Sequence, residues 1–331
     1  MPAPTPDAIV ITGATGTGKS RLALDVSERL AGEIISADSR QVYRCMDIGT
    51  AKPAAPERSR VRHYGIDCLD PEESYSAGRF ARDAWRWMGE IRGRGHVPVI
   101  VGGTGFFVRA LLSPLGPEPE LDPERRARLR RYLMRQPTGQ LKRWLERLDP
   151  KRAEVLQGEG GAQRLARSLE VVLLSGRGHS WWLDRPPETP TPTPTLSAAV
   201  FCLQLPREEL YRRIDGRFER MMADGLLDEV RMLLERYAPD SPGLKSVGYA
   251  ELVACLRGER TLEEAVQEAK RNTRRFARRQ LTWFRHQLPE DTIRIDASRP
   301  REELVRDVCR IWGERVGQAG SETSSAIAWG E

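Results

Sequence analysis

The residues whose types and spacing are best suited to chemistry form one short stretch near the N-terminus: Gly13, Ala14, Thr15, Gly16, Thr17, Gly18, Lys19 and Ser20. The stretch has the phosphate-loop pattern G-x-x-x-x-G-K-[ST], and it lies between the apolar run 8–11 and a segment with apolar residues at helical spacing. Backbone N–H groups of the glycine loop, the start of the helix and the Lys19 ammonium all attract negative charge, and the Ser20 hydroxyl suits Mg²⁺. The pattern therefore predicts a phosphate or diphosphate site, but it does not say which phosphate is held.

Two further polar side chains follow apolar runs that read as strands. Asp38 follows residues 34–37, and Thr104 follows residues 97–101 after two glycines. Because ligands bind at the carboxyl ends of parallel strands, we expect both side chains beside the phosphate loop. Asp38 is the candidate proton acceptor; alternatively it caps the next helix or holds Mg²⁺ through water. Thr104 can position a diphosphate or a base, and it can also cap the helix that starts at Gly105.

The elements that must position these groups are predicted from the alternation along the chain. Residues 1–115 read as strands alternating with helices, which favours an α/β fold with a parallel sheet. Residues 116–185 read as an Arg-rich helical insertion, and residues 186–195 as a Pro/Thr-rich linker. Residues 196–316 return to the core with a strand at 199–203 and then become helical and basic. Residues 317–331 are small and polar, and we expect them to be disordered.

A basic helix is predicted over residues 269–285. One side of its helical wheel carries Ala269, Thr273, Phe276, Gln280 and Trp283, and the other carries Arg271, Arg274, Arg275, Arg278 and Arg285. The acids at 263, 264 and 268 lie near the helix start and would not neutralise the later turns. A polyanionic partner is therefore the better interpretation, and a solvated helix face is the alternative. Arg213 and Arg217 lie off the apolar side of an earlier helix and are free to point at a site.

Composition narrows the class of protein. The chain has 331 residues with 30% charged and 39% hydrophobic side chains and a net charge of +6, which indicates a soluble globular protein of about two structural units. Its 5 cysteines and 4 histidines are scattered, which argues against a disulfide framework or a zinc site and favours the cytoplasm. The N-terminus lacks the features of a secretory signal, and no apolar run is long enough to span a membrane.

Taken together, these motifs resemble the tRNA dimethylallyltransferase (tRNA isopentenyltransferase) family of bacterial type over roughly residues 8–290. Beyond the phosphate loop, the motifs that carry the resemblance are DSRQVY at 38–43, GTAKP at 49–53, YSAG at 75–78 with Phe80, VGGTG at 101–105, QRL at 163–165 with Arg167, Leu169 and Glu170, Arg213-Ile214 with Arg217 and Phe218, SVGY at 246–249 and RRQLTWF at 278–284. The chain departs from the usual pattern at Ala14, Thr17, Tyr64-Gly65 and Phe106-Phe107, which bears on the shape of the prenyl channel.

The resemblance implies a reaction and a fold. A dimethylallyl group would pass from dimethylallyl diphosphate to N6 of adenosine 37 in tRNAs that read codons beginning with U. The fold would be a P-loop NTPase-like parallel sheet with a helical insertion that clamps the anticodon stem-loop and a helical C-terminal part. The phosphate loop would hold the prenyl diphosphate with Mg²⁺, bound at Ser20, and would not hold ATP. The protein would act as a cytoplasmic monomer.

The resemblance also implies roles for particular residues. Lys19 and Arg217 would assist departure of the diphosphate, Asp38 would accept the proton of the amine, and Thr104 would position the reactants. The residues expected to contact tRNA are Asp38, Ser39, Arg40, Gln41, Thr104, Arg126, Gln163, Arg164, Leu165, Ala166, Arg167, Arg274 and Arg278.

Three other functions are compatible with parts of the sequence. A small-molecule kinase would explain the phosphate loop but not the insertion or the arginines of 271–285. A non-catalytic RNA-binding module would explain the basic segments but not the phosphate loop or Asp38. An adenylate prenyltransferase would use the same chemistry, but AMP needs no long basic surface.

Overall fold

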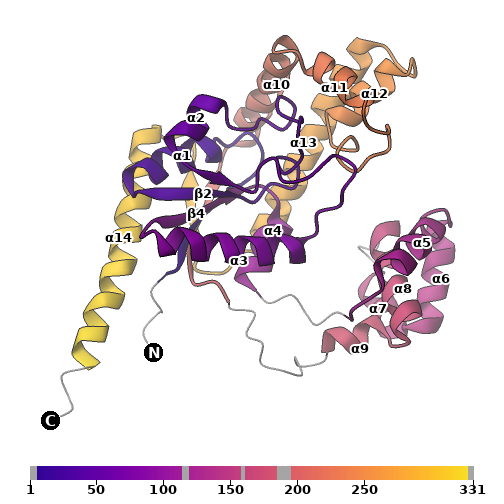
Figure 1. Cartoon of the computed structure of the whole chain (residues 1–331), viewed down its shortest axis with the longest axis horizontal. Helices are drawn as coiled ribbons and strands as arrows, with labels where there is room; N and C mark the ends of the chain where they lie inside the picture. The colour runs from indigo at the N-terminus through magenta and orange to yellow at the C-terminus, as the bar shows by residue number, and fades with distance from the viewer. Residues whose placement is uncertain (1–5, 114–118, 158–160, 185–194, 327–331) are drawn as a thin grey trace. The chain divides into compact units, whose positions relative to one another are not determined.

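The computed structural model describes residues 6–113, 119–157, 161–184 and 195–326, with side chains up to residue 317 (Figure 1). The chain divides into two compact units. The first consists of residues 1–113 with 195–331, and the second of residues 114–194. The predicted linker lies outside the described residues except for Thr195, so its conformation is not considered further.

The first unit is built on a six-stranded sheet with the order β3-β2-β4-β1-β5-β6, in which every neighbouring pair is parallel. The strands are β1 (Ala8–Gly13), β2 (Gly32–Ser36), β3 (His63–Tyr64), β4 (Val97–Gly102), β5 (Ala198–Gln204) and β6 (Ile293–Asp296). The central strand β1 is buried along its whole length, as expected for a parallel sheet covered on both faces. The predicted α/β fold with a parallel sheet is confirmed.

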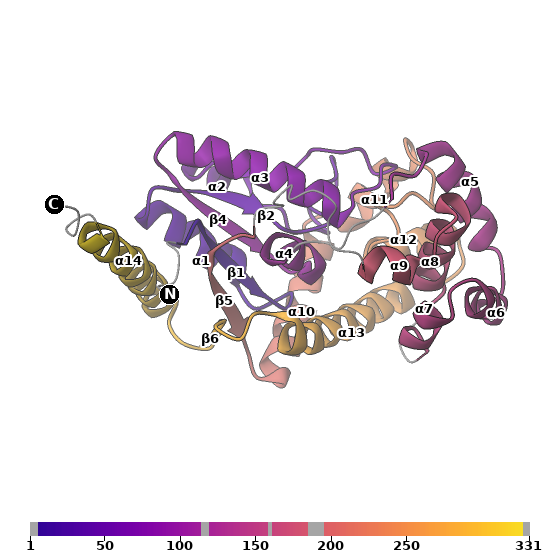
Figure 2. The same cartoon turned by 90° about the horizontal axis from the view of Figure 1, so that it is seen from below.

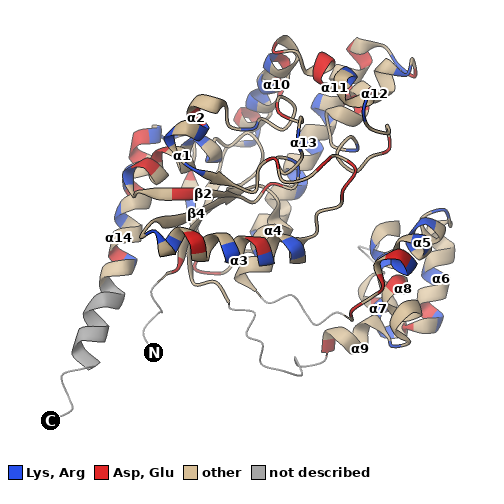
Figure 3. Cartoon of the chain, viewed as in Figure 1, with Lys and Arg blue, Asp and Glu red and all other residues tan. Residues whose placement is uncertain are grey.

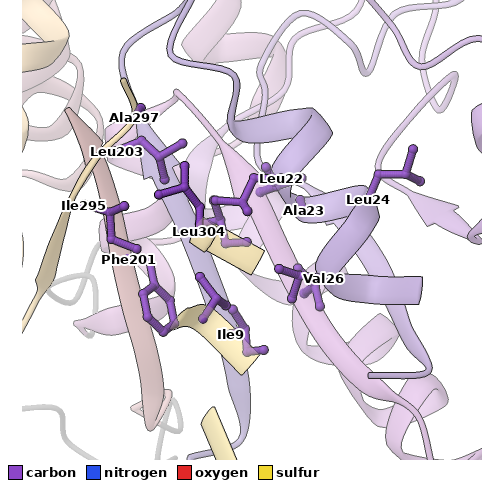
Figure 4. Close-up of a cluster of buried hydrophobic side chains, with 14 of the residues drawn as sticks. Ile9, Leu22, Ala23, Leu24, Val26, Phe201, Leu203, Ile295, Ala297 and Leu304 are labelled. Carbon is purple, nitrogen blue, oxygen red and sulfur yellow. The ribbon is translucent and has the colours of Figure 1, made fainter. Parts of the chain in front are cut away.

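Helices cover both faces of this sheet. One face packs against α1 (Lys19–Arg29) and α14 (Arg301–Ala326), and the other against α3 (Ala77–Gly93) and α4 (Gly105–Leu112) (Figure 2). Side chains of β1 alternate between the two cores, so Ile9 joins the first and Val10 the second. In the first core, Ile9 lies in one apolar cluster with Leu22 of α1 and Leu304 of α14 (Figure 4).

A helical layer extends the first unit beyond the sheet. It contains α10 (Arg207–Ala223), α11 (Leu226–Leu234), α12 (Tyr249–Leu256) and α13 (Leu262–Gln287), and a short helix α2 (Ala55–Arg60) precedes β3. Along α10, Ile214 belongs to the sheet core and Phe218 to the core of the helical layer. Likewise Ala277 of α13 packs in the sheet core and Ala269 in the helical one. These two helices therefore connect the layers.

The second unit is helical in its described part. Its elements are α5 (Pro123–Leu133), α6 (Thr138–Leu148), α7 (Pro150–Val155), α8 (Ala162–Ser175) and α9 (His179–Asp184). It has a hydrophobic core of its own, in which Leu141 and Leu145 of α6 pack with Leu165 and Leu169 of α8.

The disorder expected from residue 317 onward stays a prediction, although the structure extends a helix into that segment. Helix α14 continues to Ala326, and residues 327–331 lie outside the described part. Upstream, Leu304, Val305 and Val308 anchor this helix against the sheet. Once a helix is nucleated, each added residue gains a hydrogen bond at small entropic cost, and the segment up to 326 contains no proline to stop it.

Candidate functional site

The phosphate loop occupies the turn between β1 and α1. Gly16 and Gly18 both adopt φ +88°, a left-handed conformation that side chains with a Cβ rarely adopt. The Thr17 hydroxyl donates to the Ala14 carbonyl at 2.9 Å and closes the loop. The first turn of α1 contains no acidic side chain, so its N–H groups and positive dipole end remain available to an anion.

Lys19 is the cation of this loop and is almost buried, with 9% of its surface exposed. Its Nζ donates to the Ala14 carbonyl at 3.4 Å. Burial lowers its pKa to about 8, since the charged form loses its hydration, while the charge of Asp38 raises the pKa and that of Arg217 lowers it further. The charges of Asp38 and Arg217 both act on Lys19, so the fold brings residues from three separate parts of the chain within electrostatic range of one another.

Arg217 on α10 is the second cation of the site. Burial lowers its pKa, the charge of Asp38 opposes that effect, and the charge of Arg220 adds to it. Within the described part of the chain, Arg217 has no ion-pair partner. The neighbouring candidate Arg213 differs, because its Nε donates to Glu209 Oε1 at 2.7 Å. Of the two arginines singled out in the sequence, Arg217 therefore remains available for an anionic ligand.

Asp38 and Thr104 lie at the carboxyl ends of β2 and β4. Asp38 Oδ1 accepts from the Arg40 N–H at 2.8 Å, and no helix starts beside it, so the helix-capping alternative is excluded. Thr104 precedes α4, but its side chain makes no capping bond. Its hydroxyl instead accepts from the Ser39 N–H at 3.0 Å and donates to Ser39 Oγ at 3.3 Å. Thr104 thus holds the segment that presents Asp38.

The other two residues of the 38–41 segment are placed differently. Arg40 is exposed and donates through Nη1 to the Pro242 carbonyl at 3.2 Å. Gln41 is buried; its Oε1 accepts from Ser36 Oγ at 2.8 Å and its Nε2 donates to the Ala51 carbonyl at 3.1 Å. Both ends of the Gln41 amide are therefore used to fix the loop, whereas the Arg40 side chain lies at the surface.

The arginines of α13 line an open pocket of about 190 Å³ on the surface of the first unit, and Figure 3 shows the basic positions along this helix. The lining residues are Arg207, Tyr211, Arg271, Arg274, Arg275 and Arg278. Arg274 Nη1 bonds Asp215 Oδ2 of α10 at 2.5 Å, so an acid from another helix compensates one charge. Arg207 lies over the Tyr211 ring at 5.2 Å. The pocket combines several cations with an aromatic edge, a composition suited to phosphate groups.

One part of the predicted helical wheel of 269–285 is wrong. Phe276 is 38% exposed, and Ala277 and Phe284 are buried in its place. The buried side of α13 is therefore centred about one position further along than the wheel assumed, because the helix packs its small residues closely against the sheet core.

The second unit contains the remaining predicted tRNA contacts. Gln163 and Arg164 are exposed at the start of α8, whereas the side chains of Leu165 and Ala166 are buried in the core of the unit, where they pack and do not reach solvent. The buried Glu170 carboxylate binds Arg126 at 3.0 Å and Arg167 at 3.4 Å. It also binds Arg130 at 3.0 Å. A sequence reading could not show that these arginines surround a buried acid.

Two buried polar residues make contacts that the sequence did not predict, although Gln280 was placed on one side of the helical wheel. Gln280 of α13 bonds the phosphate loop and the turn after β4. Glu229 of α11 accepts from three successive N–H groups, those of Asp47, Ile48 and Gly49, at 2.9, 2.7 and 3.2 Å. In the sequence, each of these residues is a single amide or acid on an otherwise apolar side of a helix. That pattern indicates a buried polar group but does not show which distant residue it bonds.

The described residues include no cluster of three or more His, Cys, Asp or Glu side chains that could hold a metal ion. Ser20 is exposed at the first turn of α1, next to the anion-binding loop. Mg²⁺ commonly uses few protein ligands and completes its shell with water and substrate phosphate oxygens. A serine hydroxyl beside a diphosphate fits that mode of binding. None of the described helices is both long enough and apolar enough to cross a membrane.

Comparison with known proteins identifies the family. The model of the IPP transferase family matches residues 41–287. The tRNA dimethylallyltransferase 1 of Citrifermentans bemidjiense is 46% identical over 277 residues, 83% of this chain and 88% of that protein. The tRNA dimethylallyltransferase of Thermomicrobium roseum is 42% identical over 84% of this chain and 83% of its own.

Solved structures agree. The full-length tRNA isopentenylpyrophosphate transferase of Bacillus halodurans has a TM-score of 0.69 and 33% identity and covers 96% of this chain and 99% of its own. A eukaryotic dimethylallyltransferase solved while acting on tRNA has a TM-score of 0.72 and 26% identity, over 88% of this chain and 73% of its own. The resemblance drawn from the motifs is thus confirmed, and this chain belongs to the IPP transferase family, the family of the tRNA dimethylallyltransferases.

Proposed function

We propose that this chain transfers the dimethylallyl group of dimethylallyl diphosphate to N6 of adenosine 37 in tRNAs that read codons beginning with U. The observation that carries the proposal is the convergence of Lys19, Arg217 and Asp38 at the phosphate loop of a chain from this family. Two cations beside an anion-binding loop suit a leaving diphosphate, and a carboxylate beside them suits the proton of the attacking amine.

The phosphate loop and its cations stabilise the leaving group. As the C–O bond of the substrate breaks, the electron pair leaves with the diphosphate, and negative charge grows on its oxygens. Backbone N–H groups of the loop, the Lys19 ammonium and the unpaired Arg217 guanidinium are placed to receive that charge. Ser20 would hold Mg²⁺ together with the diphosphate, and the ion would supply further positive charge there.

Asp38 completes the transfer at the other end. The N6 amine of adenine forms the new C–N bond and must lose one proton, which passes to the Asp38 carboxylate. One oxygen of that carboxylate is bonded to the Arg40 N–H, which fixes its orientation. Thr104 holds the adjacent Ser39 from the end of β4, so the carboxylate keeps its place relative to the sheet.

Recognition of tRNA requires a surface for phosphates and a way to reach the base. The pocket lined by Arg271, Arg274, Arg275 and Arg278 supplies cations for the backbone. The exposed Gln163 and Arg164 of α8 are suited to reading base edges in the anticodon loop, and Arg40 adds a further contact. The base must leave its stack to reach Asp38, which costs a few kcal/mol. We further propose a cytoplasmic enzyme acting as a monomer.

The proposal is tested by incubating the purified chain with labelled dimethylallyl diphosphate, Mg²⁺ and unmodified tRNA that has adenosine at positions 36 to 38. We expect label at N6 of adenosine 37 only. Parallel reactions replace tRNA with AMP, or the prenyl donor with ATP and a small alcohol. Label on free AMP would favour an adenylate prenyltransferase, and phosphorylation of the alcohol would favour a kinase. Absence of label from every tRNA would contradict the proposal.

A further inference from the structure

The side chain of Gln280 lies between the two halves of the proposed site. Gln280 is 8% exposed, on the inner side of α13. Its Oε1 accepts from the Thr15 N–H of the phosphate loop at 2.9 Å, across 265 residues of sequence. Its Nε2 donates to the Gly103 carbonyl at 2.7 Å, across 177 residues. One amide therefore connects the loop after β1 with the turn after β4.

Each of these two bonds leads to a different part of the chemistry. Thr15 belongs to the loop that holds the diphosphate and ends at Lys19. Gly103 precedes Thr104, whose hydroxyl holds Ser39 beside Asp38. The phosphate loop is thus bonded to one end of the amide, and the segment that receives the proton is connected to the other. Leaving group and proton acceptor are held by separate backbone segments, and Gln280 bonds to both.

Close packing keeps this amide in place. A Cβ built on Gly103 would lie 2.7 Å from Gln280 Nε2 and 3.5 Å from the Cε of Lys19. A Cβ on Gly105 would lie 2.3 Å from the Trp283 ring, one turn further along α13. Only glycines allow the helix to approach the turn this closely. Because the Gln280 amide is hydrogen-bonded at both ends and closely surrounded, it is held in one position. A side chain that only filled space would not require these two hydrogen bonds.

We propose that Gln280 is a positioning residue for prenyl transfer, which sets the separation between the diphosphate and the Asp38–Thr104 pair. The proposal rests on the function proposed above. Bond formation requires the reacting atoms to approach within about 3–3.5 Å, and a displacement of about 1 Å can cost about a hundredfold in rate. Loss of the amide should therefore lower kcat far more than it weakens the binding of tRNA, which the arginines of α13 hold on the opposite face.

The test compares Gln280→Met, Gln280→Glu and the control Gln287→Met. Methionine keeps the length of the side chain but makes neither bond, and glutamate keeps the acceptor for Thr15 but loses the donor for Gly103. Gln287 lies on the same helix, is exposed and accepts from Arg109 Nη1 at 2.8 Å. For each full-length variant we would measure kcat, the KM for both substrates, the Kd for inorganic diphosphate and the melting temperature.

We expect both Gln280 variants to fold, to lose about tenfold to a hundredfold in kcat, and to keep the KM for tRNA within about twofold. The Kd for inorganic diphosphate should rise several-fold, because the loop loses its fixed partner. Gln287→Met should match the wild type in every measurement.

Three results would overturn the role of Gln280. One is a kcat for Gln280→Met within about twofold of the wild type. Another is a parallel loss of tRNA affinity, diphosphate affinity and kcat in a folded variant, and the third is failure of both variants to fold. Wild-type protein that prenylates no tRNA would instead refute the proposed function itself. The Kd for inorganic diphosphate can be measured in either case, so it tests the contact of Gln280 with the phosphate loop separately from prenyl transfer.

Discussion

At the scale of single residues, the proposed site depends on two cations and one carboxylate whose charges act on one another, with Lys19 almost buried and Arg217 and Asp38 partly exposed. Lys19 is almost buried, and its pKa falls to about 8 because burial outweighs the attraction of Asp38. A bound diphosphate would stabilise the charged ammonium, because its oxygens replace the hydration that burial removed. The site of the free protein is therefore electrostatically unfavourable by itself and becomes favourable with its anion.

The pKa of Lys19 predicts a pH dependence. Lys19 must be protonated to attract the diphosphate, so kcat/KM for dimethylallyl diphosphate should fall as the pH rises through about 8 in the free enzyme. A bound diphosphate raises the pKa of the ammonium, so the corresponding fall in kcat should occur at higher pH. Lys19→Met should have low activity without this alkaline fall, whereas Lys142→Met, a control at an exposed lysine of α6, should retain it. Coincident profiles for Lys19→Met and the wild type would contradict the assignment.

Replacing Asp38 by Asn tests its role as the proton acceptor. The amide cannot take the proton, so kcat should fall by about 10²–10⁴-fold while the Kd for tRNA stays within about twofold. Asp38 also raises the pKa of Lys19, so the alkaline fall in kcat/KM should move to lower pH in the variant. Single-turnover kinetics and tRNA binding measure the two effects, with Asp70→Asn as a control at the surface. A loss of tRNA affinity as large as the loss of rate would make Asp38 a binding residue.

At the scale of elements, α10 and α13 determine the site. Each begins or ends in the helical layer and packs against the sheet, so residues of both helices reach the phosphate loop. Helix α10 supplies Arg217 and packs Ile214 against Gly16. Helix α13 presents arginines on its outer side and Gln280 on its inner side. One helix thus carries both a candidate polyanion surface and a contact to the loop.

The outer side of α13 should be visible in the salt dependence of tRNA binding. Replacing Arg274 and Arg278 by Ala should weaken binding and reduce the magnitude of the slope of log K against log salt by about 1–2. The reason is that binding releases fewer counterions when fewer phosphates are contacted. Filter binding at several salt concentrations measures the slope. The matched control replaces Arg82 of α3 and Arg306 of α14, both exposed, and should leave the slope unchanged. An unchanged slope in the α13 variant would indicate that the arginines of this helix are solvated and do not contact phosphates of the tRNA.

In the insertion, Glu170 should be essential for stability. Its carboxylate is buried and bonded to Arg126, Arg130 and Arg167. Glu170→Gln leaves these partly exposed guanidiniums without their acid, and breaking a buried ion pair of this kind costs about 3 kcal/mol or more. We expect earlier unfolding and faster proteolysis of residues 119–184, measured by thermal denaturation and limited digestion. The control Glu146→Gln, at an exposed acid of α6, should change neither.

At the scale of the whole molecule, the chain consists of a catalytic unit interrupted by a helical one. Residues Leu111 and Leu196, on either side of the insertion, are hydrogen-bonded to each other, the Leu196 N–H donating to the Leu111 carbonyl at 3.2 Å. Among the residues that the structure describes, the hydrophobic clusters around the sheet contain none from the insertion, and the insertion has its own core. This arrangement is expected of an inserted domain that is not needed for folding of its host.

Excision of the insertion tests this division. Replacing residues 114–194 by a short Gly/Ser bridge should leave a folded unit that still binds inorganic diphosphate with a Kd within about threefold of the intact chain, because the phosphate loop, Lys19 and Arg217 are retained. Transfer to tRNA should be lost, because the tRNA contacts proposed for α8 are removed. Calorimetry with diphosphate and the labelled transfer assay measure the two outcomes. Full transfer activity without the insertion would show that the insertion is not required for tRNA recognition.

Local pattern was enough to predict the main elements of the fold. The apolar runs before Gly13, Asp38 and Gly102 gave strands close to their observed bounds, because strands buried on both faces are continuously apolar. The strands at 63–64 and 293–296 were missed, since so short or half-buried a strand has no pattern of its own and depends on its neighbour. The helical wheel wrongly placed Phe276 on the inner side for a related reason. Tertiary packing, and not side-chain type, decided which side of the helix faces inward.

The sequence by itself determined the phosphate loop, the polar residues at the strand ends and the basic helix, because each is a feature of neighbouring residues. Only the tertiary structure decided how they act together. It placed Arg217 and Asp38 within electrostatic range of Lys19 and paired Arg213 and Arg274 with acids. It also used the amide of Gln41 inside a loop and bonded Gln280 to both the phosphate loop and the turn after β4. The physical reason is that charge compensation and hydrogen bonding depend on distance in space, and residues far apart in the chain acquire that distance only when the sheet and its helices pack.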